Sequence, residues 1–493
     1  MIKFGKFLPD QPVFKNSGST VANNVIPTAS GYSPLKDVKP LSSGATDNYI
    51  RGMASAKDDA SSTGLYVGDE NSLYKLDATN ASLEDVSKAS DASYSTGDGF
   101  NWRFVQFGEE LIATNYSDNI QTITAAAGGR FSDLAGSPPK AKYIAVVRDF
   151  VMCGYTNDST DGEKPYRVRW SGIGDYDSWA ISPTTQADFQ DIADLGAVTG
   201  LVGGEYATIL MEKGIVRAQY VGSPLVFEFD KVQIQKGCKI PNSVASIGHM
   251  VFYLSDDGFY AFDGQSSKPI GSERVNKYFL KRFESSFSGR MSSVVDPLRQ
   301  VVFWSYASVN SGDGTPDEMI MYNYATDNWS TASIGLDAMA PLFTAGYTLE
   351  GLVNISSNLD DLPSSLDSEV YKGGEFFFAG SKENKVQTFT GNNLPATIET
   401  PEFDVQTGHS SLVNGIIPYV ESNSGSGFTL SAQVASRSTQ NSTSEYGAES
   451  PLNANNYCPL RSTGKFHRIR VNISGDWNHA QGVDVDAKPT GRR

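Results

Sequence analysis

A hairpin pattern that recurs along the chain constrains its fold more than any other feature. The stretch SDDGFYAFDG (255–264) shows the pattern, because an acidic turn with a glycine is followed by apolar and aromatic residues that return along a second strand. Strand-forming residues on both sides of a short polar turn are the signature of a β-hairpin. The same order of residues is found at 64–78, 108–123, 204–222, 248–264, 299–329 and 373–391.

The spacing of these hairpins indicates how they are arranged. Most of them start about 40 to 55 residues apart, which is typical of four-stranded propeller blades. One four-stranded sheet leaves its faces exposed, whereas several sheets around an axis bury them and protect their edges. The composition agrees, with 11% aromatic residues, 47 glycines and 22 prolines. We therefore predict an all-β protein with a β-propeller-like domain of roughly five to seven blades, and stacked β-sandwiches are the alternative.

The chain divides into four predicted regions. Residues 1–50 are rich in proline, which disfavours helix and predicts an extended N-terminal arm. The propeller-like domain is predicted at 51–334, followed at 335–398 by a loop-rich insertion with a late blade-like hairpin. From 399 to 493, apolar and polar residues alternate as in half-buried strands. This last region is predicted to be a β-sandwich or barrel-like module, or a set of strands that completes the propeller.

Charge and cysteine content limit the classes of partner. The chain has 40 basic and 56 acidic residues and a net charge of −16, which disfavours adhesion to a nucleic acid backbone. Its three cysteines are widely spaced and predict neither a disulfide framework nor a zinc site. The N-terminus lacks the apolar run of a signal peptide, and no segment approaches the ~18 apolar residues of a membrane-spanning helix. We expect folding in a reducing cytosol, without membrane insertion.

A search for catalytic and metal-binding motifs finds none. The sequence contains no HExxH, GxSxG or glycine-rich phosphate loop. His467 and His479 would meet across a hairpin, but a third metal ligand is missing. Acidic pairs are frequent, and a glycosidase needs two facing carboxylates, but acidic residues are also common in turns. These pairs are Asp58–Asp59, Asp256–Asp257, Asp360–Asp361 and Asp484–Asp486. We predict a protein that is not an enzyme, with no catalytic residue, no cofactor and no metal.

Two local features have two interpretations each. Trp170 and Trp179 bracket a glycine-aspartate turn, and they are either an aromatic platform for a sugar or, as we favour, core residues that close a blade. The last thirty residues are basic within an acidic chain. They form either a solvated face or a docking surface for an acidic neighbour, which includes another copy of the chain.

Both ends of the chain resemble one family. The stretch FLPDQPVFKNSGSTVANNVIPTASGYSPLKDV resembles the N-terminus of the tail nozzle, or tail tubular B-type, proteins of short-tailed bacteriophages. The shared features are a Leu-Pro-Asp-like arm, Asn-Val-Ile-Pro and Gly-Tyr. FHRIRVNISGDWNHAQGVDVDAKPTGRR is similar to the C-terminal signature of the same group, which has an Arg-rich strand, Gly-x-Trp, a Gly-Val-Asp strand and a Gly-Arg-Arg end. These stretches cover about sixty residues, and the middle agrees only in general architecture.

The resemblance implies a structural protein of the virion tail that is assembled in the bacterial cytoplasm. It implies a homo-hexameric ring below the portal and the tail adaptor protein, which continues the DNA channel, retains the packaged genome and anchors tail fibres, spikes or a needle. Double-stranded DNA would pass through this channel without specific binding. Six copies would carry about −96 formal charges, and an acidic lumen would let DNA slide.

Assembly contacts are then expected at both ends of the chain. The residues that we single out are Leu8, Pro9, Asp10, Val25, Ile26, Pro27, Tyr32, Arg468, Arg470, Arg492 and Arg493. The alternative functions are a carbohydrate-binding β-propeller and a polysaccharide-degrading enzyme.

Overall fold

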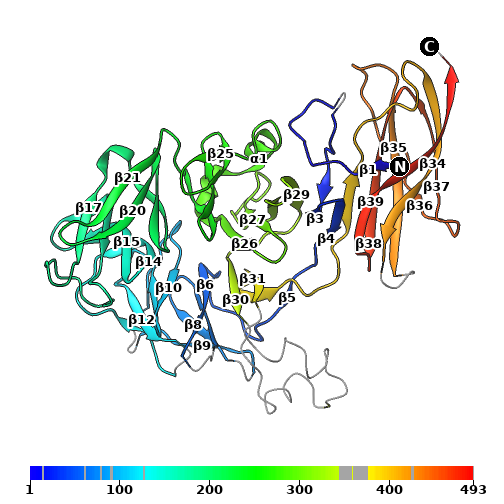
Figure 1. Cartoon of the computed structure of the whole chain (residues 1–493). Coiled ribbons are helices and arrows are strands. Elements are labelled where there is room, and N and C mark those ends of the chain that lie inside the picture. Colours follow the sequence, from blue (N-terminus) through cyan, green and yellow to red (C-terminus); the bar gives the residue numbers. More distant parts are fainter. Residues whose placement is uncertain are drawn as a thin grey trace.

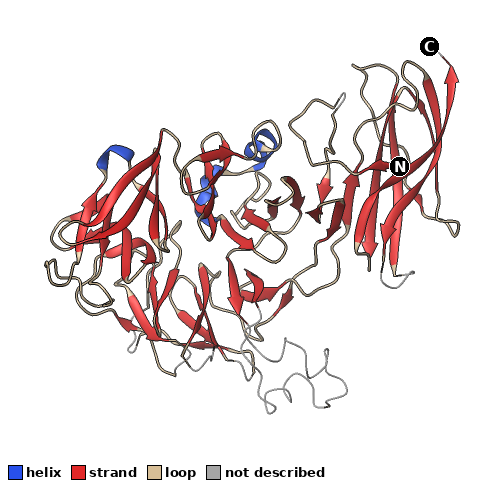
Figure 2. Cartoon of the chain, viewed as in Figure 1, coloured by secondary structure: helices blue, strands red, loops and turns tan. Residues whose placement is uncertain are grey.

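The computed structural model describes residues 1–13, 16–59, 63–77, 80–88, 93–125, 128–343, 358, 376–422 and 427–491. The described chain is almost entirely β (Figure 2). Its helical segments are α1 (Asn276–Arg282) and the short 3-10 helices η1 (Ala193–Leu195) and η2 (Ser285–Arg290). The prediction of an all-β protein is therefore confirmed.

Five antiparallel four-stranded sheets follow one another along the chain and form blades 1 to 5 (Figure 1). Blade 1 contains β6 (Gly52–Lys57), β7 (Thr63–Gly68), β8 (Leu73–Leu76) and β9 (Leu83–Asp85). Blade 2 contains β10 (Arg103–Phe107), β11 (Glu110–Thr114), β12 (Gln121–Thr124) and β13 (Ser132–Asp133). Blade 3 contains β14 (Lys140–Val147), β15 (Phe150–Asp158), β16 (Gly162–Trp170) and β17 (Asp188–Asp191). Blade 4 contains β18 (Val198–Val202), β19 (Tyr206–Met211), β20 (Gly214–Gly222) and β21 (Val226–Ile234). Blade 5 contains β22 (Ile240–Ile247), β23 (Met250–Ser255), β24 (Gly258–Phe262) and β25 (Ser267–Pro269).

Two further blades close the ring. Blade 6 contains β26 (Ser292–Asp296), β27 (Val301–Tyr306), β28 (Glu318–Asn323) and β29 (Asn328–Ala332). Blade 7 contains β30 (Met339–Phe343), β31 (Phe376–Lys382), β32 (Lys385–Thr388) and, from the N-terminal region, β5 (Lys39–Pro40). The first strands of successive blades contact each other around the axis, and β30 of blade 7 contacts β6 of blade 1. The domain is therefore a seven-bladed β-propeller.

The sheet pairing changes the domain limits expected from the sequence. Residues 335–398 supply three strands of blade 7, so the propeller extends to Thr388 instead of ending at 334. Residues 1–50 do not form a free arm, because β5 is the outermost strand of blade 7 and pairs with Gln387 and Thr388. Within the expected insertion, residues 344–357 and 359–375 lie outside the described residues.

A second module lies beside the propeller and consists of two packed sheets (Figure 1). One sheet contains β3 (Val25–Thr28), β4 (Gly31–Pro34), β39 (His479–Gly491), β34 (Ser410–Glu421) and β37 (Cys458–Gly464), with β1 (Ile2–Lys3) paired to β39. The other contains β33 (Ala396–Glu399), β38 (Phe466–Gly475), β35 (Phe428–Arg437) and β36 (Ser450–Pro451). Side chains of both sheets, such as Val413 and Ile469, belong to one buried cluster, so the module is a β-sandwich.

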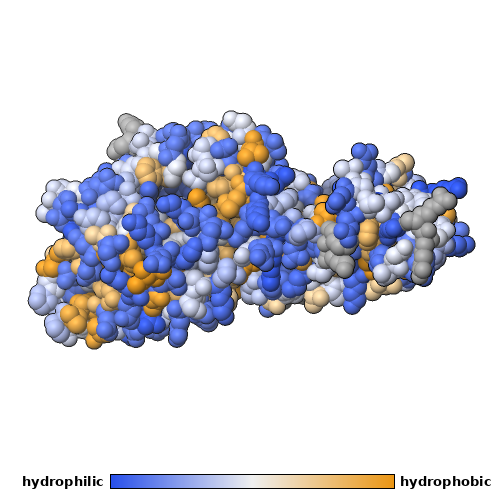
Figure 3. All heavy atoms as spheres, turned by 90° about the horizontal axis from the view of Figure 1, so that it is seen from above, coloured by the Kyte–Doolittle hydropathy of each residue, from blue (hydrophilic) through white to orange (hydrophobic). Residues whose placement is uncertain are grey.

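One continuous sheet joins the two parts of the molecule. Strand β2 (Ala22–Asn23) pairs in parallel with β29 of blade 6 and antiparallel with β33 of the sandwich. This creates a nine-stranded sheet from β26 to β36. The apolar core is continuous as well, because Trp304 and Trp329 of blade 6 belong to the same buried cluster as Trp477 of the sandwich. Figure 3 shows the result from above as an elongated molecule with a waist.

Candidate functional site

The N-terminal residues 1–40, here called the junction segment, connect the propeller to the sandwich. Strand β1 pairs with β39 through Ile2 and Val483, and β4 pairs with β39 through Tyr32 and Ala480. Each of these pairs joins residues more than 440 positions apart in the chain. The stretches that resemble the two ends of the tail nozzle family are therefore hydrogen-bonded to each other.

The Leu-Pro-Asp part of the junction segment lies against the start of helix α1. Leu8 is buried, and its peptide N–H donates to the Ser19 carbonyl at 2.7 Å. Pro9 and Asp10 are half-buried. The Asp10 carboxylate accepts hydrogen bonds from the backbone N–H groups of Lys277 and Tyr278, both at 2.7 Å. These are two of the N–H groups that the first turn of a helix leaves unsatisfied, so Asp10 anchors the segment to α1.

The Asn-Val-Ile-Pro and Gly-Tyr parts of the segment are buried between the propeller and the sandwich. Val25, Ile26, Pro27 and Tyr32 are all inaccessible to solvent or nearly so. The Pro27 carbonyl accepts a 2.9 Å hydrogen bond from the Asn323 side chain of blade 6. The Tyr32 hydroxyl donates to the Gly5 carbonyl at 2.8 Å, and burial raises the pKa of Tyr32. These apolar side chains therefore form the core of the junction.

Two glycines allow the ends of the chain to cross at close range. A Cβ atom on Gly31, whose φ is +145°, would lie 2.1 Å from the Ala480 carbonyl oxygen. A Cβ atom on Gly482 would lie 2.3 Å from the Ile2 carbonyl oxygen. Both distances are far below van der Waals contact, so neither position has room for a side chain. The glycines of the Gly-Tyr and Gly-Val-Asp motifs are thus explained by this crossing.

Two arginines of the C-terminal stretch contact one buried carboxylate. The Glu399 side chain is 1% exposed, and its Oε1 accepts from Nε and Nη2 of Arg470 at 3.0 and 2.8 Å. Its Oε2 accepts from the Thr20 hydroxyl at 2.6 Å and lies 3.6 Å from Nη1 of Arg468. The Tyr446 ring is 3.9 Å from the Arg470 guanidinium carbon. The arrangement is a buried ion cluster that holds the junction segment, β33 and β38 together.

The structure shows what the residues predicted to make assembly contacts do within their own chain, and their contacts with other subunits stay a prediction. The apolar residues that we assigned to another subunit or to the adaptor are packed inside their own chain. Arg468 and Arg470 likewise contact Glu399 of their own chain. Arg492 and Arg493 lie outside the described residues. Any contact that the junction segment makes with another subunit would involve residues other than its buried apolar side chains.

The tryptophan pair is part of the core. Trp170 and Trp179 are 2% and 1% exposed, and they belong to two different apolar clusters of the propeller. The interpretation as core residues is therefore correct, and the sugar platform is contradicted. Their indole N–H groups donate to the carbonyls of Gln186 and Tyr176, which satisfies them without a ligand.

The histidines and acidic pairs do not converge on a metal. His467 is fully buried and contacts the hydroxyls of Ser411 and Ser436 at 2.7 and 2.8 Å. His479 lies in the other sheet and contacts the Thr28 hydroxyl. Burial lowers the pKa of His467. Within the described ranges, no three His, Cys, Asp or Glu side chains are grouped so that they would hold a metal ion.

The acidic pairs that the structure describes lie in turns or on the sandwich surface. Asp256 and Asp257 form the turn between β23 and β24, where Asp257 accepts hydrogen bonds from Lys236 at 2.7 Å and Tyr260 at 2.9 Å. Asp484 and Asp486 accept hydrogen bonds from the hydroxyls of Tyr419 and Tyr457. Asp360 and Asp361 lie outside the described residues.

The comparisons with known proteins concern the fold alone. No protein-family model matches the chain, and no curated protein matches it. The WD40 domain of Neurospora crassa Pan2 is 9% identical, with a TM-score of 0.39, over 62% of this chain and 89% of that domain. The extracellular domain of a one component system from B. thetaiotaomicron is 9% identical, with a TM-score of 0.42, over 80% of this chain and 44% of that one. At these scores the likenesses carry no argument, and the assignment of the propeller depends on the sheet pairing.

Two groups of residues were not indicated by the sequence. Glu399 stands at the end of an alternating strand, where an acidic side chain is unremarkable, and only the fold shows that it is buried. Arg103 and Tyr143 face the propeller axis from the inner strands of blades 2 and 3.

The described part of the chain contains no helix with the length and hydrophobicity needed to cross a lipid bilayer.

Proposed function

We propose that the protein is a structural subunit of the tail nozzle of a short-tailed bacteriophage. In this proposal six copies form a ring below the portal and the adaptor protein. The ring continues the DNA channel, retains the packaged genome and anchors fibres or spikes. The propeller and the sandwich are the rigid parts of each subunit.

One observation carries the proposal. The motifs that resemble the tail nozzle family stand at opposite ends of the sequence, and in the fold they form one structural unit. Asp10 anchors the junction segment to α1, Gly31 and Gly482 allow the strands to cross, and Tyr32 and Trp477 are buried at the junction. The Gly-Tyr and Gly-Val-Asp motifs therefore have a structural reason that depends on the opposite end of the chain. This shared role of the two stretches supports the proposal.

The DNA path of the proposed ring does not run through the cavity inside one propeller. The cavity between blades 2 to 5 has a volume of about 450 Å³, in the range of small-molecule sites, which are about 300 to 1,000 Å³. In the proposed ring the duplex would pass along the symmetry axis between copies, where the acidic character of the chain disfavours adhesion.

The proposal is tested by electron microscopy of the full chain mixed with the adaptor and portal of the same virion. Classes are refined without imposed symmetry, and the adaptor–portal complex alone is the control. We expect an additional ring with six copies of this chain and an open axial channel. A chain that stays monomeric with the adaptor present would contradict the proposal.

A further inference from the structure

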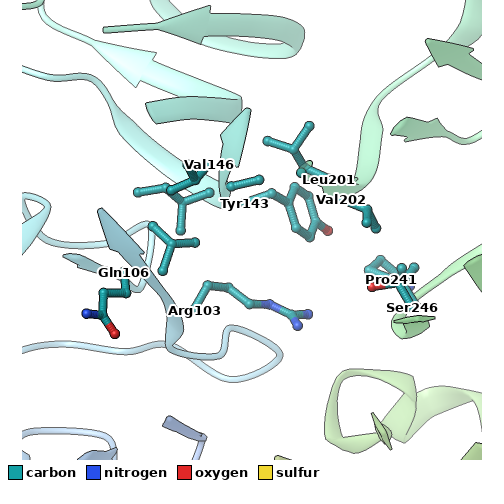
Figure 4. A pocket seen from close by; sticks show the side chains of 14 residues that line it. Arg103, Gln106, Tyr143, Val146, Leu201, Val202, Pro241 and Ser246 are labelled. Atoms are coloured by element: carbon teal, nitrogen blue, oxygen red, sulfur yellow. The ribbon is translucent and has the colours of Figure 1, made fainter. Parts of the chain in front are cut away.

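A cavity of about 450 Å³ on the propeller axis has an unusual lining (Figure 4). Its walls come from the inner strands of blades 2 to 5, which are β10, β14, β18 and β22. Most of the lining is apolar, with residues such as Val105, Val146 and Leu201. Among the described residues that line it, Arg103 is the only charged one.

Arg103 extends from β10 into this cavity and makes no ion pair with a described residue. Its Nη2 donates to the amide oxygen of Asn242 at 2.5 Å, and its guanidinium carbon lies 5.9 Å from the centre of the Tyr143 ring. Burial lowers the pKa of Arg103 from its ordinary value, although a guanidinium stays charged at neutral pH. The cavity therefore contains a cation without a counter-charge.

Three other arginines whose side chains are at most 18% exposed differ from Arg103, because each is paired with a carboxylate. Arg51 is paired with Glu70, Arg290 with Asp337, and Arg437 with Glu402. Burying a charge is costly unless it is paired, and a chain with 56 acidic residues has many potential partners. No carboxylate among the described residues forms an ion pair with Arg103, so the position opposite its guanidinium is open to an anion.

Tyr143 supplies a second polar group, whose hydroxyl has no hydrogen-bond partner among the described residues. Its side chain comes from β14, is 6% exposed and points into the cavity beside Arg103 (Figure 4). Its hydroxyl makes no hydrogen bond to a described residue. Burial raises the pKa of Tyr143, so the hydroxyl stays protonated and remains a hydrogen-bond donor. Each of the inner strands β10, β14, β18 and β22 is also the edge strand of its sheet, so backbone N–H groups on its free edge face the propeller axis.

We propose that the axial cavity binds a small molecule through an oxyanion, a carboxylate or a phosphate group, placed against the guanidinium of Arg103 and the hydroxyl of Tyr143. The apolar remainder of the lining accommodates the uncharged part of the molecule. A guanidinium matches the geometry of both kinds of oxyanion, because its N–H groups form a planar fork. The inference is independent of the proposed role in the virion tail.

The test is calorimetric titration of the full chain with inorganic phosphate and, separately, with citrate, at an ionic strength kept constant with sodium chloride. We expect saturable binding of one molecule per chain for at least one of the two probes. Arg103→Gln should weaken that binding at least tenfold, and Tyr143→Phe should weaken it less. Arg130→Gln is the matched control, because Arg130 lies at the exposed end of the same blade and should leave binding unchanged.

The outcomes are distinct. Binding of phosphate alone assigns a phosphate ligand, and binding of citrate alone assigns a carboxylate. Binding of neither probe at millimolar concentration, or equal loss in the Arg103 and Arg130 variants, would overturn the proposal. If Arg103→Gln does not fold by circular dichroism, Arg103→Lys keeps the charge and should bind with reduced affinity. Unchanged affinity in this lysine variant would also count against the site.

Discussion

Glu399 neutralises two arginines in the interior of the junction. Glu399→Gln keeps the size of the side chain and removes its charge, which leaves Arg468 and Arg470 without their counter-ion. Removing one partner of a buried ion pair costs about 3–5 kcal/mol, and we expect the free energy of unfolding to fall by this amount. Chemical denaturation measures the change. The control is Glu205→Gln, an exposed acid that is 3.6 Å from Arg148, and it should have no measurable effect. Equal stability of the two variants would contradict the assignment.

Gly482 is the residue on which the crossing of the chain ends depends most directly. Gly482→Ala would place a methyl group against the Ile2 carbonyl, so β1 would have to move away from β39. Overpacking of this kind typically costs about 1–3 kcal/mol. Thermal unfolding should show a lower midpoint than in Gly312→Ala, where the added Cβ has no neighbour within 4 Å. A midpoint equal to that of the control would show that β1 and β39 tolerate separation.

His467 makes stability dependent on pH. Burial lowers its pKa, because desolvation disfavours the imidazolium. As the pH falls, His467 therefore becomes protonated at a higher pH in the unfolded state than in the folded state. The contribution to stability is complete above the unfolded pKa of about 6.5 and is lost as pH falls toward the folded pKa. Between pH 7.5 and pH 5, His467→Gln should therefore lose less stability than the exposed control His249→Gln, measured by urea denaturation. An identical loss in both variants would exclude this role.

At the scale of elements, the junction segment completes three separate sheets. Deletion of residues 1–41 removes the partners of β32, β33 and β39. Hydrogen exchange should accelerate in these three strands, because an edge strand without a neighbour has unpaired N–H groups. Strands β14 to β16 of blade 3 pair with no described strand of the segment and serve as the internal control. Uniform acceleration over the whole chain would instead indicate global unfolding.

The structure shows which elements sequence reasoning finds. All six expected hairpins exist, as at β23–β24 and β31–β32, because apolar strands and their turn are local in sequence. Blade 3 was not indicated as a hairpin, since a bulge between Gly154 and Thr156 interrupts the alternation in β15. Strands β2 and β5 have two residues each and carry no periodicity, so their distant partners were not predictable.

For the whole molecule, the continuous sheet predicts that the sandwich and blade 6 unfold together. Each contributes tryptophans to one core cluster: Trp304 and Trp329 from blade 6 and Trp477 from the sandwich. Three variants can be made, each of which keeps one of these three tryptophans and replaces the other two. The denaturation midpoint measured by tryptophan fluorescence should be the same in all three variants. A lower midpoint for Trp477 alone would show that the sandwich is an independent unit.

Charge is the other property of the whole molecule that can be tested. In the proposed ring, the net charge of −16 per chain would keep double-stranded DNA from adhering to the channel wall. The assembled ring should show no retention of duplex DNA in filter binding at low salt. Salt-dependent retention, with affinity falling steeply as salt rises, would indicate a basic wall and contradict this part of the proposal.

The pairing of β1 with β39 also sets a time order for biosynthesis. At a translation rate of about 5–20 residues per second, the partner of β1 emerges from the ribosome roughly 25 to 100 s after β1 itself. During this interval β1 remains unpaired, and β5 has no partner until β32 has been made. A chain that terminates early completes neither its sandwich nor the junction. Truncated products would keep open strand edges for proteases to attack, so the fold itself distinguishes finished chains from unfinished ones.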